Sequence, residues 1–452
     1  MKGKSPASSP VRRLLRLGGL AGRVGASLAG EQILSLTRSG ASRDAHRLDN
    51  LVRNAGRIAH ALGELKGAAM KVGQMLSLQD SMLPPEVAEV LRSLQKQAPP
   101  MPFEVVEDEL DLELPGWRDL FVRLEPEAFA AASIGQVHRG LLRDGRHVAV
   151  KVQYPLIDRI VAADLTNLRR VLQMVLALVT DIDFEPIWCE LRDRLTEELD
   201  YLHEAENTRR LARAYDGVGD VVIPGVVDEA TTRRVLTMEY VTGVSPDAAC
   251  SDRHDQALRD RWGAVLFDFL LRGLLEHRLL HADPNLANFS FLPDGRVVVY
   301  DFGCVKAVPP GIARGYRNVT RAALDGRRDD IPALLDAMGV GAASGGPLSA
   351  ELIAPVVDLV MEMLDPGQPY RFGGDDRIFH RMIEIKSTHF DEVTDLRFPP
   401  HIVFINRTVV GHFGNLSRLR AAAPWRQILE TRLDAAARRP SLPKTQVTRS
   451  RA

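Results

Sequence analysis

Apolar residues in the first quarter of the chain recur with the period of a helix. One stripe steps by alternating intervals of four and three residues, at Ile58, Leu62, Leu65, Ala69, Val72 and Leu76. This spacing keeps the apolar side chains on one helix face. We therefore predict helix between Gln32 and Gln97, interrupted at Pro84-Pro85, where Pro85 can open a second helix over Glu86–Gln97.

From about Leu120 the pattern changes to that of strands. Ala132–Leu142 and Val148–Val152 flank an Asp144-Gly145 turn. Two β-prone runs around an Asp-Gly dipeptide are typical of a β-hairpin. Two further strands are predicted at Val221–Val227 and Arg234–Glu239.

Helical patterns dominate the rest of the chain. They cover Ile157–Val179, Ile187–Tyr215, Ala257–His277 and most of Gly311–Ala435, and two short strands are predicted within His281–Phe302. A small strand-rich part followed by a large helical part predicts an α+β architecture. A dinucleotide-binding doubly wound sheet is excluded, because the strands do not alternate with crossover helices.

Composition narrows the class of protein. The 452 residues are 45% hydrophobic and 26% charged, and 58 basic against 59 acidic residues give a net charge of −1. Such a balance argues against a protein that coats nucleic acid, and against wholesale disorder. The three cysteines, Cys189, Cys250 and Cys304, lie far apart, which excludes a disulfide framework and fits a reducing compartment.

The chain ends call for separate predictions. No run reaches the roughly 18 apolar residues that a membrane-spanning helix needs. Val11–Gly30 is apolar, but its arginines break the apolar core that a secretory signal requires. The segment is either a loosely helical lead-in, which we favour, or an amphipathic contact with a membrane surface. The Pro/Ser/Arg-rich segment Ala436–Ala452 is predicted to be disordered.

The strongest chemical signal lies in the second half of the chain. Asp283 is followed by Asn288 five residues later and by the tripeptide Asp301-Phe302-Gly303, whose aspartate comes 18 residues after Asp283. This order and spacing is typical of the catalytic loop and metal-binding loop of protein kinases. Asp301 and the amide oxygen of Asn288 would hold Mg²⁺, and Asp283 would orient or deprotonate a nucleophile.

Upstream residues agree with a kinase-like nucleotide site. Lys151 ends the run Val148-Ala149-Val150-Lys151, where its ammonium can reach phosphates, and an acid of the following helix would ion-pair with it. The sequence alone leaves Glu198, Asp200 and Glu204 open for that role. The strand Val235–Glu239, followed by Tyr240-Val241-Thr242-Gly243, is predicted to be the hinge, with Met238 near the adenine and the Glu239–Val241 backbone pairing with its edge.

The glycine-rich loop of ordinary protein kinases is missing. Where Gly-x-Gly-x-x-Gly would precede the lysine strand, the chain reads Ala130-Ala131-Ala132-Ser133-Ile134-Gly135. Alanine carries a Cβ and does not readily adopt the positive φ angles through which glycine amides wrap phosphates. Phosphate geometry must therefore differ from that of an ordinary protein kinase.

Over roughly residues 45–425 the chain resembles the UbiB/AarF/ADCK family of atypical kinase-like ATPases, which is linked to coenzyme Q (ubiquinone) biosynthesis. The resemblance rests on Lys71-Val72-Gly73-Gln74, the alanine-rich loop, Val148–Tyr154, Glu198-Leu199-Asp200, Asp283–Asn288 and Asp301-Phe302-Gly303. It implies a bilobal kinase-like fold with a helical extension packed over the active site, binding of ATP with Mg²⁺, and a lipid or quinone-precursor partner.

The same resemblance assigns roles to individual residues. It implies that Lys151 pairs with Glu204 and that Ala131, Ala132 and Ser133 contact the nucleotide. It also implies that Lys71, Gln74, Glu198 and Asp200 line the active site over the nucleotide. With Glu239, Val241, Asn288 and Asp301, these residues complete the predicted ATP and Mg²⁺ site, in which Asp283, Lys151 and Glu204 are the catalytic set.

Five segments follow from these patterns. They are a flexible or amphipathic segment 1–44, a helical extension 45–115, a kinase-like N-lobe 116–243 with inserted helices, a helical C-lobe 244–435, and a disordered tail 436–452. The expected location is cytoplasmic, with a peripheral contact at the inner membrane surface and no transmembrane helix. Nucleic acid is not an expected partner, and the oligomeric state stays open.

Two alternatives to an ATPase or small-molecule kinase stay open. The first is a non-catalytic nucleotide-binding scaffold, because binding and turnover use nearly the same residues. The second, a conventional protein kinase, is disfavoured, because no Ala-Pro-Glu and no long activation segment follow Asp301-Phe302-Gly303.

Overall fold

The computed structural model describes residues 101–132, 134–159, 184–367, 369–374 and 396–438, together with a few single positions in the gaps. The helices predicted between Gln32 and Gln97, most of Ile157–Val179 and the predicted disordered tail beyond residue 438 lie outside the described residues. The chain divides into two compact units. The first contains the described residues up to Glu206 and Gly225–Tyr240, and the second contains Asn207–Pro224 and the residues from Val241 onward.

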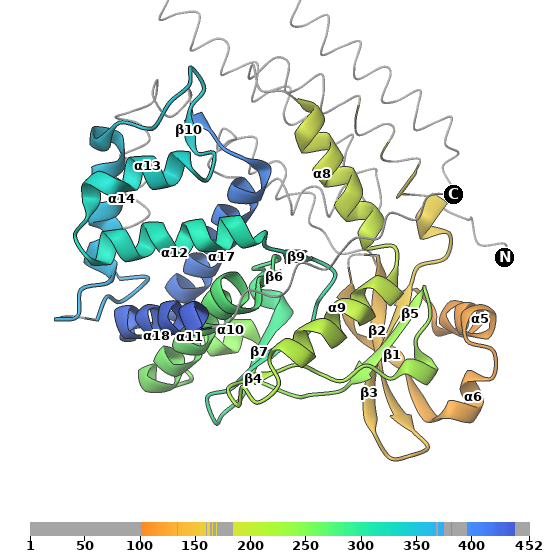
Figure 1. The fold of residues 1–452 in the computed structure, drawn as a ribbon. Helices are drawn as coiled ribbons and strands as arrows, with labels where there is room; N and C mark the ends of the chain where they lie inside the picture. Colours follow the sequence, from red (N-terminus) through yellow and green to blue (C-terminus); the bar gives the residue numbers. More distant parts are fainter. Residues whose placement is uncertain are drawn as a thin grey trace, which may run out of the picture. The chain divides into compact units, whose positions relative to one another are not determined.

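The first unit is built on a four-stranded antiparallel sheet in the order β1-β2-β3-β5 (Figure 1). Its strands are β1 (Phe121–Ala132), β2 (Gly135–Leu142), β3 (His147–Gln153) and β5 (Val235–Glu239). The predicted hairpin is present as β2 and β3, and Gly145 in its turn has a φ of +90°, which favours glycine.

Alternation along β3 assigns the two faces of this sheet. Val148, Val150 and Val152 are buried, whereas Ala149 and Lys151 between them are half-buried on the opposite face. The valine face packs against α5 (Phe103–Glu113) and α6 (Trp117–Leu120), and the shared apolar core includes Val106 and Leu110 of α5 (Figure 1). Lys151 is therefore held by a strand whose other face is fully packed.

The helical stretch predicted over Ile187–Tyr215 is broken into two helices. The structure has α8 (Phe184–Glu197) and α9 (Tyr201–Ala214), with a turn over residues 198–200. Asp200 accounts for the break, because its Oδ1 accepts a hydrogen bond of 3.0 Å from the Leu202 amide at the start of α9. Aspartate favours such helix starts by satisfying a backbone N–H that has no partner within the helix.

The second unit is mainly helical (Figure 1). Its longer helices are α11 (Gln256–Leu271), α12 (Pro310–Leu324), α14 (Ala350–Met363), α17 (Pro400–Leu419) and α18 (Trp425–Arg438), and its shorter ones are α10 (Pro246–Ala249) and α13 (Ile331–Asp336). One large core joins α11 to α17 and α18. A strand-rich unit followed by a helical unit confirms the predicted α+β class.

Short strands hold the loops of this unit. The strands β4 (Val221–Val222), β8 (Val297–Val299) and β7 (Phe289–Phe291) form one sheet in that order, and β6 (Leu279–His281) pairs with β9 (Val305–Ala307). A third pair joins β10 (Gly341–Ala342) to β11 (Leu396–Arg397). The two strands predicted within His281–Phe302 are β7 and β8.

Two predicted elements are shorter than the sequence suggests. The strand predicted at Val221–Val227 is only β4, because Pro224 cannot donate to a ladder and the chain from Gly225 belongs to the first unit. The helix predicted to reach His277 is α-helical only to Leu271. It continues as a π-helical turn over Arg272–His277 and stops at Arg278, whose φ is +54°.

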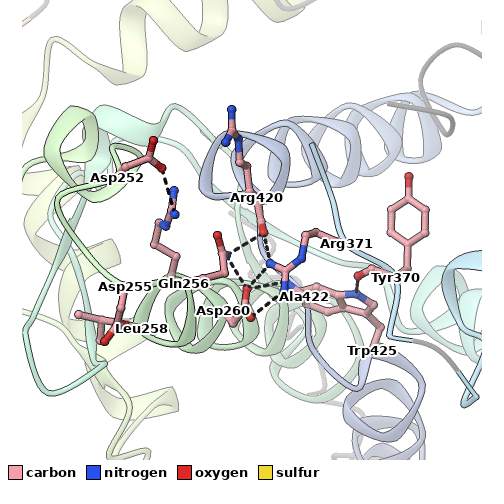
Figure 2. Close-up of polar contacts among 11 residues, drawn as sticks. Asp252, Asp255, Gln256, Leu258, Asp260, Tyr370, Arg371, Arg420, Ala422 and Trp425 are labelled. Carbon is pink, nitrogen blue, oxygen red and sulfur yellow. Dashed lines mark hydrogen bonds and ion pairs between the residues drawn. The ribbon is translucent and has the colours of Figure 1, made fainter. Parts of the chain in front are cut away.

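A polar cluster at the start of α11 ties distant segments together (Figure 2). Asp260 accepts hydrogen bonds from Gln256 on its own helix (2.7 Å), from the Arg371 guanidinium (2.9 Å) and from the Ala422 amide (2.9 Å). Burial alone would raise the pKa of Asp260, but these hydrogen bonds outweigh it and hold the pKa below the ordinary value. Arg371 and Gln256 also donate to the Arg420 carbonyl. The Asp260 carboxylate and its partners therefore fix the segment between α17 and α18 to the start of α11.

Each unit contains two of the four tryptophans, and all four are buried. Trp117 and Trp188 lie in the first unit at 6% and 4% exposure, and Trp262 and Trp425 lie in the second at 0% and 1%. Among the residues that the structure describes, no helix combines the length and the apolar character that crossing a membrane requires.

Candidate functional site

The first unit contains a lysine in an ion pair. Lys151 Nζ lies 3.0 Å and 2.9 Å from the two carboxylate oxygens of Glu204, which is on the first turns of α9. The lysine side chain is 13% exposed and that of Glu204 is 6% exposed. Glu204, one of the three acids that the sequence left open, therefore contacts the Lys151 ammonium with both carboxylate oxygens. Because both side chains are largely buried, little water competes for this ion pair.

The strand register defines the surroundings of the ammonium. Lys151 is paired across the sheet with Val137 of β2 and with Leu236 of β5. Its ammonium lies 5.0 Å from the centre of the Tyr201 ring, at the start of α9. An aromatic face attracts a cation through its quadrupole. The ring and the carboxylate together restrict where the ammonium can point.

Two acids of the predicted active-site set lie at the junction of α8 and α9. Glu198 and Asp200 are both half-buried in the turn between these helices. The Asp200 carboxylate caps α9 through Leu202, and its Oδ2 lies 3.8 Å from Arg233 Nε. The structure therefore gives Asp200 a local role in starting the helix that carries Glu204. Lys71 and Gln74 lie outside the described residues.

The alanine-rich loop forms the tip of the β1–β2 hairpin. Ala131 pairs with Gln136 and Ala132 pairs with Gly135, and Ser133 lies outside the described residues. Gly135 is required by a close backbone approach, because a Cβ there would overlap the Val152 carbonyl oxygen. Ala131 and Ala132 do not have positive φ angles. The alanines thus continue the strand rather than forming an open glycine loop.

Backbone groups at the predicted hinge are partly used within the protein. The Glu239 amide donates to the Gly225 carbonyl (2.8 Å), and the Glu239 carboxylate accepts from the Gly225 amide (3.0 Å). In the second unit, the Val241 carbonyl accepts a hydrogen bond of 2.8 Å from the Tyr300 hydroxyl. The Glu239 N–H is therefore already used and cannot donate to a nucleotide base. The Val241 carbonyl has already accepted one hydrogen bond, which reduces its capacity to accept another from a base.

The second unit contains the loop that carries Asp283. The Asn285 amide donates to Asp283 Oδ1 (3.2 Å), which orients the carboxylate. Asn288 Nδ2 donates to the Asp283 carbonyl (3.3 Å) at the end of the short helical turn Leu286–Asn288. Asp283 and Asn288 therefore lie in one loop, whose two ends are joined by the hydrogen bond between them. Both side chains are half-buried.

The loop that carries Asp301 is fixed to the Asp283 loop. The Ala282 amide donates to the Cys304 carbonyl (2.8 Å), extending the β6–β9 pairing. His281 Nε2 lies within hydrogen-bond distance of the Asp301 carbonyl. Because a carbonyl oxygen only accepts, Nε2 carries the proton. Asp301 Oδ1 accepts from the Gly303 amide (3.0 Å), which orients the carboxylate.

Sequence reasoning missed two residues that support this loop. His281 was not among the predicted site residues, although it directly precedes Ala282-Asp283 and reaches the Asp301 backbone. Asn207, in the middle of α9, donates from its side chain to the Phe302 carbonyl at 3.2 Å and is 1% exposed. A polar residue in the apolar stripe of a helix is a signal, but only the fold shows what it contacts.

The donor atoms in the second unit fit a magnesium ion. Asp301 provides a carboxylate and Asn288 an amide oxygen, which are the hard donors that Mg²⁺ prefers. Because Asn288 Nδ2 is engaged by the Asp283 carbonyl, the oxygen of this amide is the end available to a cation. The two residues come from loops that the Tyr300 amide joins by a 3.0 Å hydrogen bond to the Asn288 carbonyl.

Comparisons with known proteins point in one direction. Residues 93–334 match the family model described as the ABC1 atypical kinase-like domain. The chain is 36% identical over 339 residues to the mitochondrial atypical kinase COQ8B of Danio rerio, covering 73% of this chain and 53% of the relative. It is 32% identical over 440 residues to COQ8B of Rattus norvegicus, covering 94% of this chain and 81% of that protein.

A solved structure shares the fold. The complex of Rv3197 from Mycobacterium tuberculosis with erythromycin is similar with a TM-score of 0.65 and 29% sequence identity, over 87% of this chain and 99% of that chain. The predicted kinase-like fold is thereby confirmed. The chain spans about half the length of the Danio rerio relative, and 57% of the probable serine/threonine-protein kinase abkA of Dictyostelium discoideum.

Proposed function

Since the chain belongs to the UbiB family of atypical kinases, whose hallmark is the ABC1 domain, we propose that it binds ATP with Mg²⁺. We further propose that it either hydrolyses ATP or transfers its γ-phosphoryl group to a small molecule. The observation that carries this proposal is the bidentate ion pair of Lys151 with Glu204, at 3.0 Å and 2.9 Å. Such a pair fixes an ammonium for contact with phosphate oxygens.

The remaining residues have separate roles in this proposal. Asp301 and Asn288 hold the cation, which when bound neutralises charge on the phosphate oxygens. Asp283 orients the attacking hydroxyl or water and accepts its proton. The Glu239 and Val241 backbone holds the base, through groups other than the Glu239 N–H. Ala131, Ala132 and Ser133 lie against the phosphates.

The metal-binding step is tested with Asp301→Asn. An amide is a far weaker ligand than a carboxylate, so the thermal stabilisation produced by ATP with Mg²⁺ should be lost. Asp294→Asn is the matched control, because Asp294 is an exposed turn residue that pairs with Arg296. A stabilisation that survives in Asp301→Asn would remove Asp301 from the metal site.

Turnover is separated from binding by Asp283→Asn. Loss of a general base should lower phosphate release by roughly 10²–10⁴-fold while ATP affinity stays within a few-fold. Phosphate release is measured with and without lipid vesicles and quinone-like phenols. Turnover equal to that of the parent would favour the non-catalytic scaffold.

We infer the biological setting from the relatives. Relatives named COQ8 support a role in quinone or isoprenoid-lipid biosynthesis, and several are named mitochondrial. A peripheral membrane contact and a lipid or quinone-precursor partner are part of this proposal. A lipid extract that co-purifies with the full chain, analysed by mass spectrometry, tests it directly.

The proposal extends to Lys71, Gln74, Glu198 and Asp200 as active-site residues over the nucleotide. If Lys71 neutralises Glu198 or Asp200 there, Lys71→Ala leaves a carboxylate uncompensated beside the phosphates. ATP affinity or turnover should then change, and isothermal titration and phosphate release measure both. Parental values in Lys71→Ala would place Lys71 outside the active site.

A further inference from the structure

Helix α17 has three buried polar side chains along one face, and Asn415 among them contacts the loop that carries Asp283. Thr408, His412 and Asn415 recur at intervals of four and three residues and are 0%, 1% and 5% exposed. Burial of an unpaired polar group costs free energy, so the presence of three polar side chains on the buried face of one helix calls for an explanation. The helix lies beyond residue 334, where the match to the family model ends.

Asn415 holds the residue next to Asp283. Its Nδ2 donates to the Pro284 carbonyl at 2.7 Å, and both residues are buried. Because an unsatisfied buried carbonyl is costly, this bond fixes the position of the Pro284 peptide unit. The unit begins one residue after Asp283, so its position limits where the Asp283 carboxylate can lie.

Gly411 brings the helix backbone against the same proline. A Cβ at position 411 would lie 2.8 Å from Pro284 Cβ and closer still to Pro284 Cγ. The proline ring is rigid and part of the backbone, so it could not turn aside as a flexible side chain could. Gly414, on the same helix, is different, because a Cβ there would meet nothing within 4 Å.

His412 extends the contact towards the Asp301 loop. Its ring lies 5.9 Å from the Phe289 ring, and Phe289 lies 5.7 Å from the His281 ring. His281 in turn reaches the Asp301 carbonyl. The same helix face therefore packs along a continuous set of side chains from Pro284 to the backbone of Asp301.

We propose that α17 is a positioning element of the active site, in which Gly411 and Asn415 hold Pro284 and thereby place the Asp283 carboxylate for catalysis. This inference rests on the proposed function for its catalytic consequence. The structural part, a loop held by α17, stands on the Asn415 bond and the Gly411 contact.

A matched pair of substitutions tests the proposal. Gly411→Ala should displace Pro284 and lower kcat for phosphate release on the order of 10²-fold, as expected for a small misplacement of a catalytic group. The KM for ATP should change less than about 3-fold, because Asp283 acts on the nucleophile rather than in binding. Gly414→Ala, the same change without the contact, should leave both within about 2-fold.

A second variant and a double variant separate positioning from general damage. Asn415→Leu keeps a side chain of similar size without the donor, and should lower kcat in the same way. In an Asp283→Asn background, Gly411→Ala should cost little more, because residues that act through one group are not additive. An equal kcat loss in both backgrounds would overturn the proposal.

Amide hydrogen exchange tests the contact between α17 and Pro284 with a measurement that does not depend on enzymatic activity. Exchange at residues 282–288 should accelerate in Gly411→Ala and Asn415→Leu and stay parental in Gly414→Ala. Parental exchange in the first two variants would overturn the proposal, whether or not the chain turns over ATP. If the parent binds no ATP, the proposed function fails while the exchange result still decides the role of α17.

Discussion

At the scale of single residues, the pair of Lys151 with Glu204 depends on both charges being present. The two side chains are 13% and 6% exposed, so neither charge is well hydrated when alone. Removing one partner from such a pair leaves an uncompensated buried charge, and the loss exceeds the net gain of the intact pair. Lys151 and Glu204 therefore matter to folding as well as to the proposed nucleotide site.

We predict that Glu204→Gln lowers the free energy of unfolding by about 3–5 kcal/mol and also raises the KM for ATP. Urea denaturation and phosphate-release kinetics measure the two effects. Glu229→Gln is the control, because Glu229 pairs with Arg146 on the surface with side chains 53% and 40% exposed. The control should change stability by no more than about 0.5 kcal/mol, and a similar loss in both variants would refute the explanation.

Burial determines the protonation state of His412. Burial, reinforced by the nearby His281, lowers the pKa of His412 from the ordinary 6.5 to about 3. The unfolded chain therefore binds a proton below about pH 6.5 that the folded chain does not bind until about pH 3. The stability associated with the neutral ring is complete above pH 6.5 and is lost as the pH falls.

We predict that the free energy of unfolding falls with pH below 6.5, with His412 contributing up to about 1.4 kcal/mol per pH unit. Urea denaturation at pH 7, 6 and 5 measures this slope. His412→Leu should show a slope shallower by that amount. Parallel slopes in parent and variant would show that His412 does not stay neutral in the fold.

At the scale of elements, the presence of helices and strands in the described residues could largely be predicted, and their ends could not. The hairpin of β2 and β3 follows from β-branched residues around Asp144-Gly145, and both strands are present. The break between α8 and α9 could not be predicted, because Asp200 in an acidic helical stretch reads equally as an exposed helix position. Only the fold shows that its carboxylate caps the next helix.

The candidate site divides in the same way. The spacing of Asp283, Asn288 and Asp301 pointed to these loops because the three residues form a motif that spans only 18 positions of the chain. Without the family resemblance, which implied Glu204, the partner of Lys151 stayed open among three acids. The reason is that α9 begins 50 residues downstream and its rotation relative to the sheet is a tertiary property. The contact of Asn415 with Pro284 spans 131 residues and has no sequence signal.

The Asp260 cluster gives a prediction for the elements it joins. Asp260→Ala removes the acceptor of the Ala422 amide and one of the two acceptors of the Arg371 guanidinium, so stability should fall by about 1–3 kcal/mol. Thermal or urea unfolding measures the loss. Asp247→Ala is the control, because the Asp247 side chain is 95% exposed and pairs only with Arg418 in the part of the chain that the structure describes. A loss in the control equal to that in Asp260→Ala would show that the cluster adds no specific stability.

At the scale of the whole molecule, the family domain and the folding unit have different limits. The family model ends at residue 334, but the core of the second unit includes Leu359, Phe372, Leu416 and Trp425 from beyond it. The Trp425 ring lies 5.2 Å from the ring of Phe267 in α11, and Trp262 of the same helix belongs to the same core. A fragment that ends at residue 334 would expose that apolar surface to water.

We predict that the chain truncated after residue 334 is insoluble or aggregates, whereas the chain truncated after residue 438 stays soluble and keeps the parental Tm within a few degrees. Size-exclusion chromatography and thermal unfolding compare the two. A soluble, cooperatively unfolding fragment 1–334 would show that α14, α17 and α18 form a separate module.

Because each unit contains two buried tryptophans, the intrinsic fluorescence of the protein can monitor the two units separately. All four indoles are shielded from water, so emission of the folded chain should be blue-shifted and should move to the red on unfolding. Replacing Trp117 and Trp188 by phenylalanine would leave Trp262 and Trp425 as reporters of the second unit alone. The converse pair would report on the first. Titration of ATP and Mg²⁺ against the two variants would then assign any change in emission to one unit, without a label.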